Sequence, residues 1–597
     1  MKTSGTQRRS SPSAWVVAIA ALIMAAAVGV DAQRRPNQSA AIDGKFDRHV
    51  RRVVEQSDDS TTQRVIVQVD PAEAERIGML LRHRGDTTLH YHGGISAFTV
   101  RAAHLRALAT DPAVRSISVD APLGALQITD IQPTQQIVRA AVSSPGGWTG
   151  AGVGVALIDS GIEPSADFSG RIAAFYDFTR GGIAATPYDD YGHGTHVAGL
   201  IGSSGTLSGG AYRGIAPDVR FVVLKALDAN GGGYTSDVIH AIEFATANRG
   251  ALGIDVINLS LGHAPYESAA TDPLVQAVEA AVRAGIVVVA SAGNYGRNAT
   301  TGEIGYGGIA SPGNAPSALT VGSFMTQDTA RHSDDRMNGY SSRGPTYYDA
   351  FAKPDLVAPG YRLISNAAKQ GTLYATYPTL RASGGTDYDY MTLSGTSMAA
   401  GVTSGVVAQM IQANRSTNPS RALPPNAVKA ELQYTALRLK DDTNTDYDGL
   451  TQGAGALNGA GAVQFARGIM NATAVGASWL DSAWAPDAGS SAIAGETVVW
   501  GNTVVWGNTV VWGNAIQVNH EAWANTVVWG NTVVWGNTVV WGNDVVNDNT
   551  VVWGNTVVWG NAVLQGNTVV WGNNDLSDAN AAANSALTGN TLLDPRP

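Results

Sequence analysis

Short apolar runs alternate with helical patterns between residues 127 and 466. Runs of strand length occupy residues 153–158, 219–224, 256–259 and 286–290, and helical stretches occupy residues 236–248, 272–284 and 397–413. An uninterrupted apolar run predicts a strand that is buried on both faces, whereas a half-exposed strand would alternate with polar residues. We therefore expect an α/β domain with a mostly parallel sheet and helices on both faces.

Residues 40–126 have a different pattern, which predicts a small α+β unit. The β-branched runs predict strands at residues 64–69, 95–100 and 114–119, and a helical pattern covers residues 102–109. Asp70 can cap a further helix that has Pro71 in its first turn.

Residues 467–597 form a repetitive region, in which Thr-Val-Val-Trp-Gly-Asn occurs nine times between Thr497 and Asn573. Each copy has four strand-favouring residues followed by a Gly-Asn turn. The six-residue period favours a β-solenoid in which three copies make one coil. The alternative is a low-complexity tail that aggregates or stays disordered, because the copies are uncharged and β-prone. The sequence of this region does not indicate its role.

The N-terminus resembles an export signal. Lys2, Arg8 and Arg9 precede an apolar run over residues 14–30, and Val30-Asp31-Ala32 has small residues where signal peptidase reads them. The alternative is a membrane anchor, but 17 residues are at the short end for a span and no second run of that length follows. We expect residues 1–32 to be a cleaved signal peptide, the product to be extracellular or at the cell surface, and no stable membrane anchor.

Composition excludes several classes of protein. The chain has no cysteine, which excludes disulfides, thiolate nucleophiles, iron–sulfur clusters and zinc-thiolate sites. Its net charge of −10 argues against nucleic acid as a partner, because a nucleic-acid-binding surface must neutralise phosphates.

Three polar positions in the α/β region are candidates for chemistry. Asp159 follows the apolar run 153–158, at a carboxyl strand end where reactive groups gather in such sheets. His193 lies between two glycines and begins a His-Gly-Thr-His sequence, so a metal held with His196 is the alternative. Ser397 starts a long apolar helix, where its backbone N–H is free to bind an oxyanion, although a simple capping serine is the alternative.

Together these motifs resemble the subtilisin-like (subtilase) serine peptidase family. Asp159-Ser-Gly, His193-Gly-Thr-His and Gly-Thr-Ser397-Met-Ala occur in that family's order. A lipase or esterase of the α/β-hydrolase type would place its serine first, within Gly-x-Ser-x-Gly, and here Ala399 replaces the second glycine. The resemblance implies a catalytic triad of Asp159, His193 and Ser397.

The resemblance extends to further positions. It implies that Asn294, in Ala-Ser-Ala-Gly-Asn, donates to the oxyanion, and that Ser260, Leu261 and Gly262 bind the substrate backbone and line its primary pocket. Two departures stand out: Gly401 replaces the family's usual proline, and the loop 203–212 lacks the asparagine often used at a tight calcium site. Metal ligands are therefore not assigned. The chemistry requires no cofactor, and structural calcium is compatible with the family.

The resemblance also implies how the protein matures and acts. Residues 40–126 resemble the family's inhibitory propeptide, 127–466 its peptidase domain, and residues 121–126 would fill the active-site cleft with cleavage near Leu126. We therefore expect a secreted serine endopeptidase whose partners are protein or peptide substrates and its own propeptide. The alternative is an adhesive or structural surface protein that carries an inactive peptidase domain.

Overall fold

The computed structural model describes residues 44–92, 95–127 and 147–469, apart from 299, 330, 385, 386, 388, 420 and 421. Beyond 469 it describes only short strands between Ser490 and Leu576. The expected signal peptide, residues 1–32, lies outside the described residues. In the described part of the chain, no helix is both long enough and apolar enough to cross a membrane.

The chain divides into two compact units, one ending at Val119 and the other beginning at Asp120. The first unit is a four-stranded antiparallel sheet in the order β2-β3-β1-β4. Its elements are α3 (Arg48–Gln56), β1 (Thr62–Val69), α4 (Ala74–His83), β2 (Thr87–His92), β3 (Ile95–Arg101), α5 (Ala102–Ala109) and β4 (Val114–Val119). The predicted strands and the helix 102–109 are confirmed, and Asp70 caps a short 3-10 turn ahead of α4.

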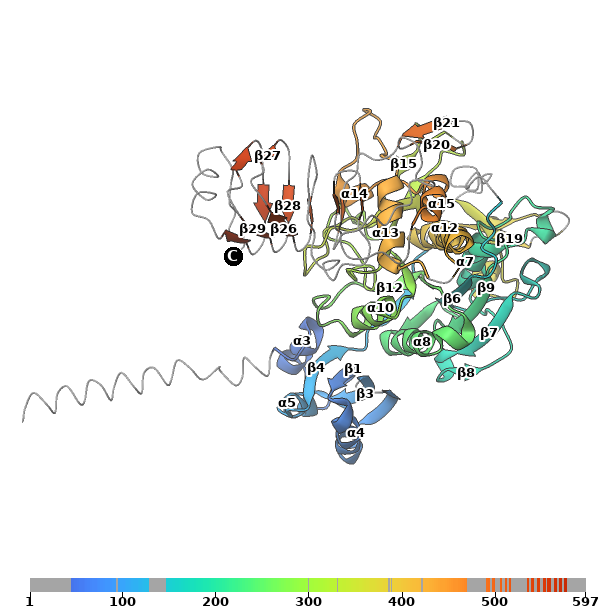
Figure 1. Ribbon diagram of the computed structural model, residues 1–597. Helices are drawn as coiled ribbons and strands as arrows, with labels where there is room; N and C mark the ends of the chain where they lie inside the picture. The colour runs from blue at the N-terminus through green and yellow to red at the C-terminus, as the bar shows by residue number, and fades with distance from the viewer. Residues whose placement is uncertain are drawn as a thin grey trace, which may run out of the picture. The chain divides into compact units, whose positions relative to one another are not determined.

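The second unit is built on a nine-stranded sheet in the order β15-β14-β13-β11-β6-β9-β7-β8, with β16 also paired to β14 (Figure 1). All its pairings are parallel except β14–β15 and β7–β8 at the edges. Its strands are β6 (Gly154–Asp159), β7 (Ile172–Asp177), β8 (Ile183–Ala184), β9 (Arg220–Lys225), β11 (Val256–Leu259), β13 (Val287–Ser291), β14 (Leu319–Met325), β15 (Arg336–Met337) and β16 (Leu356–Pro359). The predicted, mostly parallel α/β sheet is confirmed.

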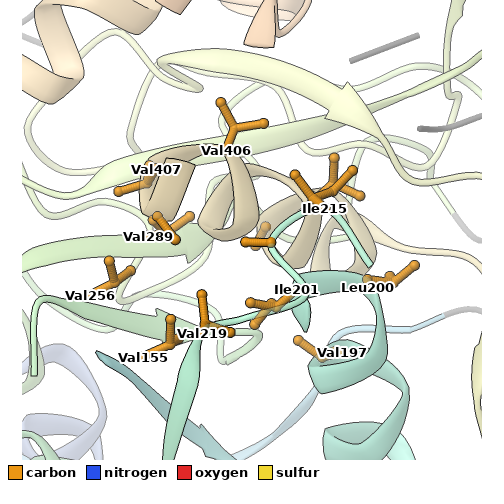
Figure 2. Packing of buried hydrophobic residues seen from close by; sticks show 14 of the residues in the cluster. Val155, Val197, Leu200, Ile201, Ile215, Val219, Val256, Val289, Val406 and Val407 are labelled. Atoms are coloured by element: carbon orange, nitrogen blue, oxygen red, sulfur yellow. The ribbon is translucent and has the colours of Figure 1, made fainter. Parts of the chain in front are cut away.

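Helices cover both faces of this sheet. α7 (His193–Gly202) and α12 (Thr396–Thr417) pack on each other and on one face, while α8 (Thr235–Ala247) and α10 (Pro273–Arg283) pack together on the other (Figure 1). The core beneath α7 and α12 is formed by branched aliphatic side chains from strands and helices (Figure 2). These include Val155, Val256 and Val289 from the strands, Val197, Leu200 and Ile201 from α7, and Val406 and Val407 from α12.

Gly401, which replaces the family's usual proline, lies inside α12. A Cβ at this position would lie 3.2 Å from Cγ1 of Val197 on α7, so the missing side chain lets the two helices pack closely. The departure therefore does not interrupt the helix that carries Ser397.

The remaining helices of the second unit are α9 (Arg249–Leu252), α11 (Thr372–Thr376), α13 (Pro425–Thr435), α14 (Gly449–Gln452) and α15 (Gly459–Arg467). Two small three-stranded sheets accompany them. The first has the order β10-β5-β12, with β5 (Pro122–Ala125), β10 (Gly232–Tyr234) and β12 (Leu261–Gly262); the second has the order β17-β19-β18, with β17 (Leu363–Asn366), β18 (Arg381–Ala382) and β19 (Tyr390–Leu393).

Between Val534 and Leu576, the described strands pair with one another in parallel at a constant spacing. Val534 pairs with Val552, Val552 pairs in turn with Val570, and Thr538 pairs with Thr556. Partners therefore lie 18 residues apart, which is the length of three six-residue repeats. The strands are β25 (Val534–Trp535), β26 (Thr538–Trp541), β27 (Val545–Asn547), β28 (Val551–Trp553), β29 (Thr556–Trp559), β30 (Val563–Gln565), β31 (Val569–Trp571) and β32 (Asn574–Leu576).

A buried carboxyl group on α13 makes stability depend on pH. Glu431 is 0% exposed, and neither carboxylate oxygen has a hydrogen-bond partner among the described residues. Burial raises the pKa of Glu431 well above its usual value. As the pH rises above about 4.3, the usual glutamate pKa, the unfolded chain releases this proton while the folded protein retains it. The free energy of unfolding therefore falls as the pH rises, until the folded group ionises as well.

Glu431→Gln should therefore raise the unfolding temperature more at pH 8 than at pH 5. The difference in the free energy of unfolding between the variant and the parent should grow by about 1.4 kcal/mol per pH unit while the parent's folded group stays protonated, because glutamine has no proton to lose. Thermal unfolding at both pH values measures this, with the exposed Glu303→Gln as the control. A gain of equal size at the two pH values would contradict the assignment.

Candidate active site

The carboxyl ends of three adjacent parallel strands meet at one edge of the large sheet. Asp159 is the last residue of β6, Ser260 follows β11, and Asn294 lies three residues after β13. The strands β6, β11 and β13 are neighbours in register, so these polar residues gather at the edge where reactive groups collect in open α/β sheets.

Asp159 and His193 form a buried hydrogen-bonded pair. Nδ1 of His193 lies 2.7 Å from Oδ1 of Asp159, and both side chains are 0% exposed. The carboxylate oxygen also accepts from the N–H of Ser160 at 2.7 Å. A proton on Nδ1 satisfies this bond, so the carboxylate holds the imidazole in the tautomer whose Nε2 is free to accept a proton.

The absence of a side chain at Gly194 allows His193 to approach Asp159. His193 is the first residue of α7, and Gly194 follows it inside the helix. A Cβ at Gly194 would lie 2.2 Å from the carbonyl oxygen of Gly161, so any other residue would push the start of α7 away from β6. The N–H of Gly194 also donates to Oγ of Ser160 at 2.9 Å.

Ser397 is the second residue of α12 and is 0% exposed. Its hydroxyl lies 2.7 Å from the carbonyl oxygen of Leu126 and 2.9 Å from that of Ser260. Nε2 of His193 has no hydrogen-bond partner among the described residues, so the serine–histidine bond is not made in this arrangement. Such bonds often form only in the reacting complex.

Asn294 faces the start of α12 through its side-chain oxygen. Oδ1 accepts from the backbone N–H and from the hydroxyl of Thr396, both at 3.1 Å. Because a backbone N–H can only donate, this contact fixes the orientation of the amide and leaves Nδ2 as the free donor. A Cβ at Gly395 (φ +148°) would lie 2.4 Å from the oxygen of Leu126 and 3.3 Å from Nδ2. Glycine at 395 therefore keeps open the space that both atoms border.

A segment of the chain itself lies beside Ser397 as a strand. β5 pairs antiparallel with β12 on one side, matching Leu261 to Ala125, and with β10 on the other. The N–H of Leu126 donates to the carbonyl of Ser260 at 3.3 Å, so the strand pairing extends as far as Leu126. The predicted substrate-binding residues Ser260, Leu261 and Gly262 thus contact an extended peptide.

The side chain of Leu126 is 7% exposed and lies beside Gly262. A Cβ at Gly262 would lie 3.4 Å from Cδ1 of Leu126 and 3.4 Å from Cβ of Ala310. The absence of a side chain at 262 therefore gives Leu126 room. The strand β10, which pairs with β5 on the side opposite to β12, was not predicted from the sequence. The run Gly231-Gly232-Gly233 could have indicated it, because glycines permit a close backbone approach.

His196 does not share a ligand with His193. Its Nε2 lies 3.0 Å from the carbonyl oxygen of Leu363 and 3.1 Å from that of Met391, so this nitrogen carries the proton. Burial, together with the nearby His193, lowers the pKa of His196 to about 3 and keeps the ring neutral. Within the described residues there is no group of three or more His, Cys, Asp or Glu side chains that could hold a metal ion.

The loop 203–212 does not fit a calcium ion beside Asp167. Oδ2 of Asp167 accepts from Ser203 Oγ at 3.0 Å, Asn366 Nδ2 at 2.7 Å and Tyr390 Oη at 2.6 Å. Burial alone would raise the pKa of Asp167, but the bonds from Tyr390 and Asn366 hold it below its usual value. A calcium site needs several oxygen acceptors turned toward the ion, whereas here the carboxylate is surrounded by donors.

Known proteins resemble this chain over the region that carries the site. The family model described as the subtilase family matches residues 150–461, more than half of the chain. Serine protease AprX of Bacillus subtilis (strain 168) is 39% identical over 314 residues, which cover 52% of this chain and 65% of that protein's length. Subtilisin DY of Bacillus licheniformis is 34% identical over 306 residues, which cover 51% of this chain and 91% of that protein.

A solved structure agrees with the fold. Fervidolysin from Fervidobacterium pennivorans, described as a keratinolytic enzyme related to subtilisin, matches with a TM-score of 0.52 and 19% identity, covering 72% of this chain and 63% of that one. At this level of identity the likeness concerns the fold alone. The family match and the subtilisin relative carry the assignment: the chain belongs to the subtilase family.

Proposed function

We propose that the chain is a serine endopeptidase that cleaves peptide bonds through an acyl-enzyme on Ser397. The observation that carries the proposal is the peptide carbonyl of Leu126, whose oxygen accepts from Oγ of Ser397 at 2.7 Å at the end of an extended, strand-paired segment. A carbonyl held against a buried serine beside a buried Asp–His pair is the arrangement that acyl transfer requires.

In the first half of the reaction Oγ of Ser397 bonds to the carbonyl carbon, and His193 Nε2 takes the hydroxyl proton. Asp159 stabilises the imidazolium through the 2.7 Å bond to Nδ1. The carbonyl oxygen becomes an oxyanion, which accepts from Nδ2 of Asn294 and from the N–H of Ser397 at the start of α12. The C–N bond then breaks, and the leaving amine takes the proton from His193.

In the second half, water attacks the ester carbonyl and gives its proton to His193. The Oγ–C bond breaks, and the proton returns to Oγ of Ser397. Before the first step, Oγ must rotate from the carbonyl of Ser260, which it contacts at 2.9 Å, toward Nε2 of His193. The site needs no redox or nucleotide cofactor for these steps.

The same proposal covers maturation. Residues 1–32 act as a secretion signal, 40–126 as an inhibitory propeptide, and 127–466 as the peptidase domain of an extracellular or cell-surface enzyme. Support comes from the strand β5, which pairs with β10 and β12, and from Leu126, whose carbonyl oxygen accepts from Oγ of Ser397. The partners are protein or peptide substrates and the protein's own propeptide.

For residues 467–597 we propose a repetitive β region built as a parallel β-solenoid with an 18-residue coil. The parallel pairings of β25 with β28 and of β26 with β29 support it, because three six-residue repeats separate the partners.

The proposal predicts that an organophosphate fluoride labels Ser397 alone in the matured protein. The reagent forms a covalent ester with a serine only where a base and an oxyanion site activate the hydroxyl. Peptide mass spectrometry of the labelled protein locates the adduct, and protein treated at denaturing temperature is the control. Proteolysis without any adduct on Ser397 would contradict the assignment of the nucleophile.

A further inference from the structure

The segment beside Ser397 continues past the bond that would be cut. Leu126 supplies the carbonyl that meets Oγ of Ser397, so Gln127 is the first residue on the leaving side. Nε2 of Gln127 donates to the hydroxyl oxygen of Tyr191 at 2.5 Å. Tyr191 thus contacts the residue after the scissile bond. Its position two residues before His193 in the sequence did not indicate this contact.

The ring of Tyr191 is held firmly in place. Its backbone carbonyl accepts from the N–H of Leu373 at 2.9 Å, and its N–H donates to Asp189 at 3.2 Å. A Cβ at Gly231 (φ +75°) would lie 2.3 Å from two ring carbons, so the ring packs directly on that glycine. The carbonyl of Gly231 also accepts from the N–H of Ala125, so the same backbone holds both the peptide strand and the tyrosine.

The hydroxyl of Tyr191 lies in a buried environment with negative charge nearby. Tyr191 is 9% exposed. Burial raises the pKa of its hydroxyl, and the charges of Asp159 and Asp189 raise it further, while the bond from Gln127 opposes them. The phenol therefore stays protonated, and a carboxylate beside it would be repelled by the two aspartates. An uncharged side chain with an N–H donor suits this position.

We propose that Tyr191 selects the residue that follows the scissile bond and favours an amide side chain, glutamine or asparagine, over an apolar or acidic one. The inference rests on the proposed peptidase function and adds a specificity to it. The strand before the scissile bond is held by backbone pairing and the Leu126 side chain lies beside Gly262, whereas the Tyr191 contact involves the side chain that follows the bond. An apolar residue of similar size would leave the buried hydroxyl without the bond it makes to Gln127.

Three peptides test the proposal, each carrying Pro-Leu-Gly-Ala-Leu followed by Gln, Met or Glu and then a common tail. We expect kcat/KM for the Gln peptide to exceed that for the Met peptide by about fivefold, the effect of one neutral hydrogen bond, and that for the Glu peptide by more. In Tyr191→Phe the Gln-to-Met ratio should fall to about one. The exposed Tyr347→Phe is the matched control and should keep the parent ratio.

The ratio separates a specific contact from general damage, because a misfolded variant cleaves both peptides less but keeps their ratio. A Gln-to-Met ratio in Tyr191→Phe equal to that of the parent would overturn the inference and leave the peptidase proposal standing. Cleavage of the Glu peptide as fast as the Gln peptide would overturn it too, and this arm needs no variant. If the parent cleaves none of the three peptides, the proposed function fails and the inference fails with it.

Discussion

A precursor that carries Ser397→Ala should stay uncut between Leu126 and Gln127, whereas the parent should yield a mature N-terminus at Gln127. The carbonyl oxygen of Leu126 lies 2.7 Å from Oγ of Ser397, so the bond between Leu126 and Gln127 lies beside the chain's own serine hydroxyl. Loss of that nucleophile should also lower the hydrolysis of added protein by about 10⁶-fold, the loss known for a relative in this family. N-terminal sequencing of the purified precursor over time measures the first effect.

The matched control is Ser416→Ala, at the far end of the same helix α12, which should mature as the parent does. A trace of parent enzyme added to the Ser397→Ala precursor distinguishes a cut within one molecule from a cut between molecules. Processing of the purified variant at the same bond and rate, with no other protease present, would show that the chain does not cut itself.

Asn294→Ala should lower kcat by roughly 10²–10³-fold with little change in KM, a range taken from the matching residue of another family member. The amide donor acts on the charge that develops in the transition state, so its loss affects the rate more than binding. The measurement is steady-state hydrolysis of a peptide with the sequence of residues 122–127.

Asn294 also holds the start of α12 through its side-chain oxygen, so the alanine variant removes two contacts at once. Asn294→Asp separates them, because the carboxylate keeps an oxygen for the N–H of Thr396, while it loses the amide donor and adds a negative charge beside the oxyanion. The aspartate variant should therefore lose at least as much kcat as the alanine variant. An aspartate variant as active as the parent would assign Asn294 a positioning role at Thr396 and would remove it from the oxyanion site.

The sequence was most informative where one local pattern determines one local structure. The apolar run at 256–259 became β11, and the helical pattern at 102–109 became α5, because each element is specified by its own residues. The parallel sheet followed from the rhythm of such runs. Short edge strands such as β8 and β15 have no comparable pattern, since their pairing depends on neighbours distant in the chain.

The site divides in the same way. Motifs placed Asp159 at a strand end and Ser397 at a helix start, and the structure has them there. The ring of His196 is hydrogen-bonded to the backbone carbonyls of Leu363 and Met391, which lie 167 and 195 positions further along the chain. The sequence could not show these contacts, so a metal remained as an alternative. The contact of Tyr191 with Gln127 was missed for the same reason, because it joins residues 64 positions apart through a side chain that no motif includes.

The strand β5 belongs to the same polypeptide as Ser397, and this has a consequence for how activity would depend on dilution. Before the cut at Leu126, the local concentration of this strand at the cleft is fixed by the chain and does not change with the amount of protein. After the cut, the strand is a separate ligand whose occupancy follows mass action. In the proposed maturation, a cut within one molecule would have a rate independent of concentration, and dilution would favour release of the strand that follows it.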